Sequence, residues 1–217
     1  MLRLYQHFKN NISSKTFIST SLSAFSWWKI GGPADCLVCV QNLADLKYVL
    51  THLRENDVPY IILGEGTNIL VDDMGFRGCV IKISRSFSKV TCKGGLMNFE
   101  AGNWVPQLSV NVARMGFSGL EHTVGIPASL GGLVPMNGGT KRKSISDHIH
   151  SVNVLDENIK IRLDLKKDCA FGYRTSRYQK NKDIIVGVNF EFDKMRSYKI
   201  QRKEMLAILR ERNLKFP

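Results

Sequence analysis

The chain has 217 residues, enough for one large domain or two small lobes, and its 43% hydrophobic content is ample for a packed core. Lysine and arginine total 31 against 19 acidic residues, which gives a formal net charge of +12. A basic balance fits nucleic acid, a membrane surface or an anionic small substrate, although charges this widely spread also suit a plain solvated face. Nucleic-acid binding is the weakest of these interpretations, because the chain lacks interleaved aromatics, a helix-turn-helix and an RNP motif.

Two further classes of protein are excluded by composition. No apolar run approaches the length of a bilayer span and no signal-peptide pattern opens the chain, so we expect a soluble protein of the cytoplasm without membrane contact. The five cysteines form no C-x-x-C ladder and the five histidines show no ligand spacing. We therefore predict free thiols in a reducing compartment and no metal site.

The N-terminal part is predicted to be the least regular. Residues 1–24 are polar and show no clear period, which is typical of a loosely held N-terminal extension. Trp27 and Trp28 follow, and we expect both indoles to pack against the turn at Gly31-Gly32-Pro33.

A first lobe of strand, helix, strand type is predicted over residues 25–85. Asn42 is a plausible helix cap, and the leucines and valine after it recur at three- and four-residue spacing up to Leu53. Short runs of apolar, β-branched or aromatic residues flank this helix. They predict strands at Cys36–Val40, Tyr60–Leu63 and Cys79–Ile83.

The loop between Leu63 and Ile69 is the first candidate binding element. Its sequence, Gly64-Glu65-Gly66-Thr67-Asn68, interrupts the apolar run YIIL, which resumes at once as Ile69-Leu70-Val71. Glycine permits positive φ and leaves no Cβ to keep a ligand away, and such a loop suits a phosphate or pyrophosphate. It matches neither common nucleotide fingerprint, so a plain turn is an equally good interpretation of the loop alone.

A second lobe, of antiparallel sheet plus helices, is predicted over residues 86–193. We expect a hairpin about Gly94-Gly95, a helix with its stripe at 105–115 that stops at Gly116, and a second hairpin from His150–Leu155 and Lys160–Leu163. The strict alternation over residues 184–192 predicts a strand with one face inside. In the closing segment, 194–217, Met205, Leu206 and Leu209 mark a weak apolar stripe on a basic helix.

Two irregular segments of this lobe are candidate ligand surfaces. The stretch GLEHTVGIPASLGGLVPMNGG, residues 119–139, is rich in glycine yet carries many apolar residues, so it is predicted to be buried backbone that touches a ligand. FGYRTSRY, residues 171–178, is an aromatic and basic loop. The basic run Lys141-Arg142-Lys143 is either a contact for an anionic substrate or simply solvated.

Five motifs resemble, in the same order, those of one family: the flavin-dependent UDP-N-acetylenolpyruvoylglucosamine reductases, MurB, which have the two-lobed α+β vanillyl-alcohol-oxidase/PCMH-type FAD-binding fold. KIGGPAD is similar to RIGGPAD and LGEGTNILV to LGGGSNLLV. GLEHTVGIPASLGG is similar to GLEFLAGIPGTVGG, MNGG to MNAG, and FGYRTSRY to FGYRxSxF.

The resemblance implies that FAD lies extended between the two lobes. The loop Gly64, Glu65, Gly66, Thr67 and Asn68 would hold the pyrophosphate through its backbone. The other residues that the resemblance assigns to the cofactor are Gly102, Asn103, Gly125, Ile126, Pro127, Ser129, Gly131, Gly132, Ile185 and Val186. A buried pyrophosphate must accept hydrogen bonds from many N–H groups. Glycine-rich backbone, as in residues 64–68 and 119–139, supplies such groups without bulk.

The resemblance also implies an activity: reduction of an enolpyruvyl ether of a UDP-sugar, with NADPH as the reductant, in peptidoglycan or related surface-polysaccharide synthesis. Arg174, the arginine of FGYR, would be the catalytic residue that stabilises the developing enolate. Tyr173 is expected to be packed rather than catalytic. Ala128 stands where the family has a glycine, and Thr140 to Lys143 replace its following tyrosine and glycine.

The family's third domain, which supplies a serine acid and a glutamate, has no counterpart in these 217 residues. Loss of a general acid typically costs about 10²- to 10⁴-fold in rate. Two explanations stay open: a shortened chain with a surviving flavin site, or a non-catalytic FAD-binding module. A homo-oligomer or a partner chain would then supply the missing domain.

Overall fold

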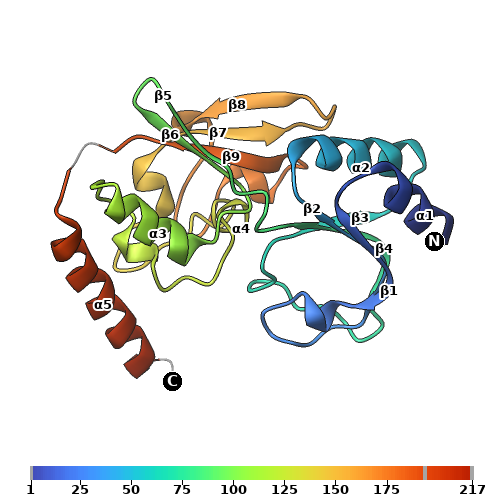
Figure 1. Ribbon diagram of the computed structural model, residues 1–217, viewed down its shortest axis with the longest axis horizontal. Coiled ribbons are helices and arrows are strands. Elements are labelled where there is room, and N and C mark those ends of the chain that lie inside the picture. Colours follow the sequence, from blue (N-terminus) through green and yellow to red (C-terminus); the bar gives the residue numbers. More distant parts are fainter. Residues whose placement is uncertain (1, 193–194, 216–217) are drawn as a thin grey trace. The chain divides into compact units, whose positions relative to one another are not determined.

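The computed structural model describes residues 2–192 and 195–215, and the chain divides into two compact units, residues 1–88 and 89–217 (Figure 1). The lobe boundary drawn from the sequence at residue 85 falls shortly before this division. The boundary drawn between 193 and 194 lies outside the described residues.

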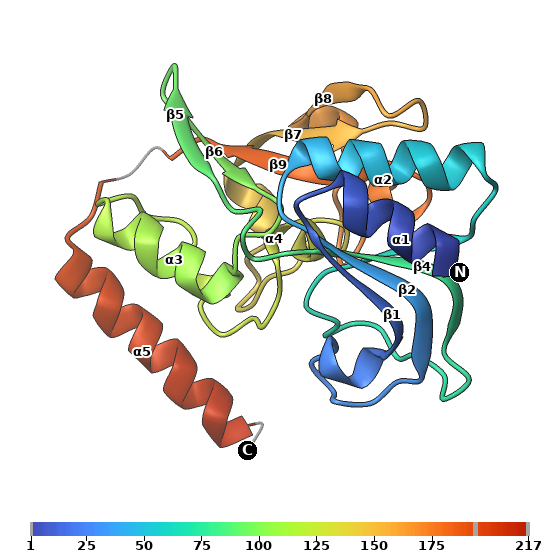
Figure 2. The same ribbon diagram turned by 45° about the vertical axis from the view of Figure 1, so that its right-hand side comes forward.

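The first unit is a four-stranded sheet in the order β1-β2-β4-β3. β1 is antiparallel to β2, whereas β2 and β3 are both parallel to β4, with α2 in the connection between β2 and β3. The two helices lie side by side over the sheet in both ribbon views, and the ring of His7 in α1 stacks on that of His52 in α2 (Figures 1 and 2). The elements are α1 (Leu2–Asn11), β1 (Lys15–Ser21), β2 (Pro33–Val40), α2 (Leu43–Glu55), β3 (Tyr60–Leu63) and β4 (Phe76–Ile83).

The expectation that residues 1–24 form a loose extension is wrong for the residues described. β1 pairs with β2 from Lys15 to Ser21, and Leu4, Phe8 and Leu22 are buried. β1 is an edge strand whose side chains are largely exposed, so its sequence carries no apolar alternation. Its position is fixed by hydrogen bonds to β2, which no local pattern reveals.

Asp45 joins the N-terminal segment to α2. Asn42 caps the helix as predicted, its side-chain oxygen accepting from the Asp45 N–H at 2.8 Å. The Asp45 carboxylate in turn accepts from the Ser14 N–H and the Ser13 hydroxyl, each at 2.9 Å, and from the Ser14 hydroxyl. Because Asp45 is largely buried, these bonds replace water rather than compete with it.

On the side of the sheet opposite α1 and α2, the loop before β2 and the loop between β3 and β4 come into close backbone contact (Figure 1). Gly75 has a φ of +77°, and a Cβ there would lie 1.9 Å from the carbonyl oxygen of Pro33. Ile69–Val71 belongs to this loop region and does not extend β3. Trp27 and Trp28 are 49% and 56% exposed, so about half of each side chain is covered by the protein.

The second unit is built on an antiparallel sheet in the order β5-β6-β9-β7-β8. Both predicted hairpins are present, and Gly94 and Gly95 form the first turn with φ of +58° and +80°, values that glycine adopts freely. The strands are β5 (Val90–Lys93), β6 (Leu96–Glu100), β7 (Ile149–Leu155), β8 (Ile161–Leu165) and β9 (Ile184–Phe190).

β9 differs from its prediction in burial. All residues from Ile184 to Val188 are buried, so both faces of the strand are covered and not one alone. β9 is the central strand between β6 and β7, and α4 packs against it. Side-chain alternation in the sequence does not report what covers the second face.

Three α-helices complete this unit: α3 (Val105–Arg114), α4 (Leu130–Leu133) and α5 (Tyr198–Lys215). α3 ends as predicted before Gly116, which has a φ of +89°. α5 lies beside α3 in both ribbon views and buries Met205 and Ile208 against Ala113 and Val124 (Figures 1 and 2). The expected stripe is partly wrong, because Leu206 is exposed and the buried positions are Gln201, Met205 and Ile208.

A 3₁₀ turn at Glu121–Thr123 buries two titratable side chains. The Glu121 carboxylate accepts from the Gly119 N–H and the Ser118 hydroxyl, each at 2.8 Å. His122 Nδ1 donates to the Gly119 carbonyl at 3.0 Å, while its Nε2 has no partner among the described residues. Burial lowers the pKa of His122, and the charge of Lys143 lowers it further. The imidazole is therefore neutral in the folded protein at pH 7.

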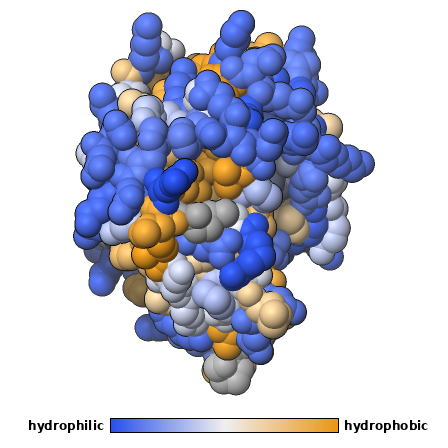
Figure 3. Space-filling model, turned by 90° about the vertical axis from the view of Figure 1, so that its right-hand side faces the viewer, coloured by the Kyte–Doolittle hydropathy of each residue, from blue (hydrophilic) through white to orange (hydrophobic). Residues whose placement is uncertain are grey.

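The helices and the surface are polar, as the content of charged residues predicts. Every helix within the described residues is too short or too polar to cross a bilayer. The face of the molecule in Figure 3 is largely hydrophilic, with apolar residues gathered in small areas.

Replacing Asp45 should loosen the N-terminal segment. In Asp45→Ala the Ser14 N–H and hydroxyl lose their acceptor inside the protein, and we expect a loss of about 2–3 kcal/mol in the free energy of unfolding. Urea denaturation measures this. Glu55→Ala, exposed at the end of the same helix, should change stability by less than about 0.5 kcal/mol. Equal effects of the two substitutions would contradict the role assigned to Asp45.

The buried imidazole should make the protein acid-sensitive. Because the folded-state pKa of His122 lies below its unfolded value of about 6.5, the unfolded chain binds more protons as pH falls below that value. Stability should therefore fall with pH below about 6.5, by at most about 1.4 kcal/mol per pH unit from this group. His122→Phe should flatten the pH dependence between pH 7.5 and 5.5, as measured by urea denaturation across that range. An unchanged slope would refute this.

Candidate functional site

The first glycine loop follows β3 and presents a row of free backbone donors. Over the part of the chain that the structure describes, no N–H from Glu65 to Val71 donates to a protein acceptor. The side chains of Thr67 and Asn68 have no hydrogen-bond partner among those residues either. A run of N–H groups next to a hydroxyl and an amide forms a concavity suited to an anion.

Contacts on the other side of the loop hold it in place. Glu65 forms a two-pronged ion pair with Arg85, with N–O distances of 2.9 and 3.0 Å, and Lys82 donates to the Gly64 carbonyl. Gly66 has a φ of +68°, and a Cβ there would lie 2.8 Å from the Cα of Ser26. The carboxylate of Glu65 is thus used structurally, and what the loop offers a ligand is its backbone.

In the second unit, three of the predicted cofactor segments come together at the start of α4. The Leu130 N–H donates to the Asn103 carbonyl at 2.8 Å, and the Gly131 N–H donates to the Ala101 carbonyl at 2.8 Å. The Ala101 N–H donates to the Val186 carbonyl of β9 at 3.0 Å. Gly102, Asn103, Ser129, Gly131, Ile185 and Val186 therefore belong to one packed region, although the sequence separates them widely.

The glycines of this region serve packing rather than hydrogen-bond donation. A Cβ on Gly131 would meet that of Ala101 at 2.8 Å, and one on Gly132 would meet the Ser129 hydroxyl at 3.2 Å. The N–H groups of Ile126, Ala128, Leu130, Gly131 and Gly132 all donate to protein carbonyls. The prediction that glycine-rich backbone supplies free N–H groups is therefore wrong for most of this segment, where internal bonds consume them.

One polar atom of the segment is left without a partner. The Ser129 hydroxyl precedes α4, is buried, and has no hydrogen-bond partner among the described residues. A buried hydroxyl without a partner is costly, so this atom marks a position where a ligand group would improve the structure.

Gly125 lies against the C-terminal helix, α5. A Cβ on Gly125 would come within 3.0 Å of the Arg212 Cδ and 3.6 Å of the Leu209 Cδ2 of α5. Ile126 packs against the core of the unit. The sequence gives no sign that α5 covers this turn.

Arg174 lies at the tip of a tight turn. Gly172 and Thr175 exchange backbone hydrogen bonds across Tyr173 and Arg174, and Arg174 has a φ of +55°. The Asn137 amide donates to the Gly172 carbonyl at 2.9 Å, which ties the turn to the MNGG segment. Tyr173 is 94% exposed, so the expectation that it is packed is wrong. Both side chains at the tip are available to a ligand.

A buried ionic network, absent from the sequence-based predictions, anchors the far end of this loop. The Tyr178 hydroxyl donates to Asp164 at 3.0 Å, and Arg162 donates to Asp164 at 2.7 Å and to Asp183. Burial by itself would raise the pKa of Asp164, but the bonds from Arg162 and Tyr178 outweigh it and the pKa is lowered. The Cys169 thiol lies 3.1 Å from the Tyr178 hydroxyl.

The tip of the loop faces a cavity of about 540 Å³. Asn137 and Gly139 of the MNGG segment line this cavity, as do the basic run Lys141-Arg142-Lys143, Tyr173 and Arg174. The structure thus brings the catalytic candidate and the basic run into one concave site.

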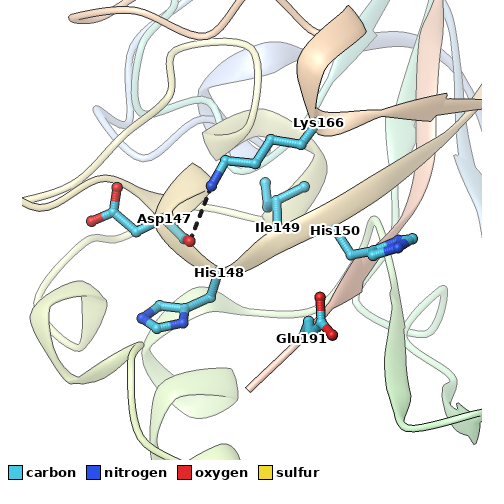
Figure 4. A pocket seen from close by; sticks show the side chains of 6 residues that line it. All are labelled: Asp147, His148, Ile149, His150, Lys166 and Glu191. Carbon is cyan, nitrogen blue, oxygen red and sulfur yellow. Dashed lines mark hydrogen bonds between the residues drawn. The ribbon is translucent and has the colours of Figure 1, made fainter. Parts of the chain in front are cut away.

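A smaller cavity of about 250 Å³ lies beside β7 (Figure 4). His148 and His150 line it with Asp147 and Glu191, but the two rings point away from each other. Lys166 donates to the Asp147 carbonyl at 3.1 Å. Within the described residues, no group of three or more histidine, cysteine or acidic side chains is arranged to hold a metal ion.

Comparison with known proteins identifies relatives of this chain. Residues 34–162 match the model of the FAD binding domain. The chain is 35% identical to the UDP-N-acetylenolpyruvoylglucosamine reductase of Carboxydothermus hydrogenoformans over 209 residues, 96% of this chain and 68% of that protein. It is 36% identical to the reductase of the same name from Heliobacterium modesticaldum, covering 90% of this chain and 63% of that protein.

Solved structures agree. The MurB reductase of Thermus caldophilus superimposes with a TM-score of 0.76 at 31% identity, over 92% of this chain and 69% of that one. A cholesterol oxidase from Brevibacterium sterolicum, at 11% identity and a TM-score of 0.62, shows the fold alone. These likenesses confirm the predicted α+β fold of the vanillyl-alcohol-oxidase/PCMH type.

The chain spans about two thirds of the length of these reductases, and somewhat less of the second. The order of motifs, the family model and identities above 30% over nearly the whole chain lead to one conclusion. The chain belongs to the UDP-N-acetylenolpyruvoylglucosamine reductase family, MurB.

Proposed function

We propose that this protein binds FAD and uses NADPH to reduce the enolpyruvyl ether of a UDP-N-acetylglucosamine in peptidoglycan or related surface-polysaccharide synthesis. The names of the relatives support this substrate and reaction. Because the chain spans only part of their length, the activity of the whole relative is part of the proposal.

The observation that carries the proposal is the row of free N–H groups from Glu65 to Val71. A pyrophosphate brings several acceptor oxygens and negative charge, which such donors satisfy well. Thr67 and Asn68 add side-chain donors, and Gly66 leaves the backbone open to close approach. The partnerless Ser129 hydroxyl is a second point where these residues fit the cofactor.

Bound FAD would supply the redox chemistry, accepting two electrons from NADPH and delivering them to the enolpyruvyl double bond. The protein's task is to stabilise the negative charge that develops on the substrate's enolate. Arg174 is the residue we assign to this task, because the anchored turn holds its cationic side chain at the cavity. Gly102, Asn103, Gly125 to Pro127, Ile185 and Val186 remain proposed as cofactor contacts.

A second candidate function is an FAD-binding module without turnover of its own. The match of residues 34–162 to the FAD binding domain supports it, because that match concerns FAD binding alone. The two candidates differ in whether substrate reoxidises the reduced flavin.

Binding of FAD should depend on the shape of the first glycine loop. In Gly66→Ala the added Cβ meets the Ser26 backbone and imposes a left-handed conformation on alanine, so we expect FAD affinity to fall about tenfold or more. Gly94→Ala is the matched control, because Gly94 also has positive φ but has nothing within 4 Å of the added atom. Fluorescence titration of apoprotein with FAD measures both. If the two variants bind FAD alike, the loop is not the pyrophosphate site.

Turnover should separate the two candidate functions. Under anaerobic conditions NADPH should bleach the flavin absorbance, and the UDP-sugar enolpyruvyl ether should restore it. Arg174→Ala should be bleached normally but restored about 10²-fold more slowly, because only the substrate step needs its charge. Lys180→Ala, exposed in the same loop region, should behave as wild type. Bleaching without restoration in the wild type would favour the FAD-binding module, and a protein that takes up no flavin would refute both.

A further inference from the structure

Lys82 places a positive charge at the base of the first glycine loop. It lies in β4, where its register partners are Cys39 of β2 and Leu63 of β3. Val80, two residues earlier on the same face of the strand, belongs with Leu63 to a buried apolar cluster, and Cys39 packs against that cluster. The side chain of Lys82 therefore starts among apolar neighbours, and the residue is only partly exposed.

The ammonium group of Lys82 has hydrogen-bond donors to spare. One N–H donates to the carbonyl oxygen of Gly64, the first residue of the loop. Among the described residues, its other two N–H groups have no acceptor and no carboxylate forms an ion pair with it. Glu65 is an acid whose charge acts on Lys82, but both of its oxygens accept from Arg85, at 2.9 and 3.0 Å. Because that pair is neutral as a whole, the charge of Lys82 is left uncompensated.

A partly buried ammonium group is costly while no anion is bound. Loss of water is the largest effect on Lys82 and lowers its pKa, whereas the charge of Glu65 acts in the opposite direction. The hydrogen bond to Gly64 does not require a charged residue, since a neutral donor would form it at a smaller desolvation cost. An anion bound beside the ammonium group would offset that cost.

We propose that Lys82 is a phosphate-binding residue of this loop, and that its ammonium group supplies positive charge to the pyrophosphate of FAD. This rests on the proposed function, in which the loop holds that group. The free N–H groups from Glu65 to Val71 satisfy acceptor oxygens but carry no net charge. Lys82 adds the missing charge from a strand, and its two spare N–H groups can form charge-assisted hydrogen bonds to phosphate oxygens.

Fluorescence titration of the apoprotein with FAD tests this on Lys82→Met. Methionine keeps an apolar stem and removes the charge, so the affinity for FAD should fall about tenfold or more. Lys82→Gln, whose amide is neutral but still donates, should bind FAD as weakly as Lys82→Met. Lys82→Arg keeps the charge and should recover most of the loss.

The matched control is Lys15→Met. Lys15 is exposed on β1 and is the register partner of Cys39, so this variant removes the same charge from the same sheet, one strand beyond Cys39. Its affinity for FAD should equal that of wild type.

Two further measurements separate a phosphate contact from a purely structural role. Wild-type affinity for FAD should fall as salt rises, and that of Lys82→Met should fall less steeply, because one charge contact is missing. The free energy of unfolding of the apoprotein, measured with urea, should be no lower in Lys82→Met than in wild type, since the variant no longer buries an ammonium group. A lysine that only held the loop through Gly64 would leave the salt dependence unchanged and make the variant less stable.

Lys82 is not a phosphate ligand if Lys82→Met keeps the wild-type affinity for FAD, or if it loses affinity with an unchanged salt dependence. Wild type that takes up no FAD would refute the proposed function and the role of Lys82 together. Wild type that binds FAD no better than Lys82→Met would refute the role of Lys82 alone.

Discussion

A backbone N–H group that finds no acceptor in its own protein must be met by water or by a ligand, and the loop after β3 collects several such groups in sequence. The loop leaves the carboxyl end of a parallel strand, which is where ligands bind in open α/β sheets. The Glu65–Arg85 pair and the contact of Gly66 with Ser26 fix its shape from the protein side.

In the second unit most backbone N–H groups of the glycine-rich segment find their acceptors within the protein. Glycine there permits close contact between Gly131 and Ala101 rather than open donors. This compact packing brings the end of β6, the start of α4 and β9 into one region. Two features of this unit remain available to a ligand: the buried Ser129 hydroxyl and the basic cavity beside the Arg174 turn.

Local signals in the sequence predicted most elements correctly, and the misses share a cause. Asn42, Gly94-Gly95 and Gly116 act through their own backbone or immediate neighbours, so the α2 cap, the first hairpin and the end of α3 could be predicted. β1 could not, because its pairing partner supplies its order. The network of Arg162, Asp164, Asp183 and Tyr178 joins separate segments through side chains that look ordinary in sequence. The motifs located the candidate site, but only the structure distinguishes a free N–H group from one already bonded.

The Arg174 turn shows what this anchoring does for recognition. Asn137 holds it at Gly172, and the Ser176 hydroxyl, two residues beyond the tip, donates to the Pro135 carbonyl at 2.7 Å. The tip is thus rigidly mounted on both sides while its own side chains stay in solvent. Little backbone entropy remains to be lost when a ligand arrives, so the affinity of this surface is governed by charge and desolvation rather than by the cost of ordering a mobile loop.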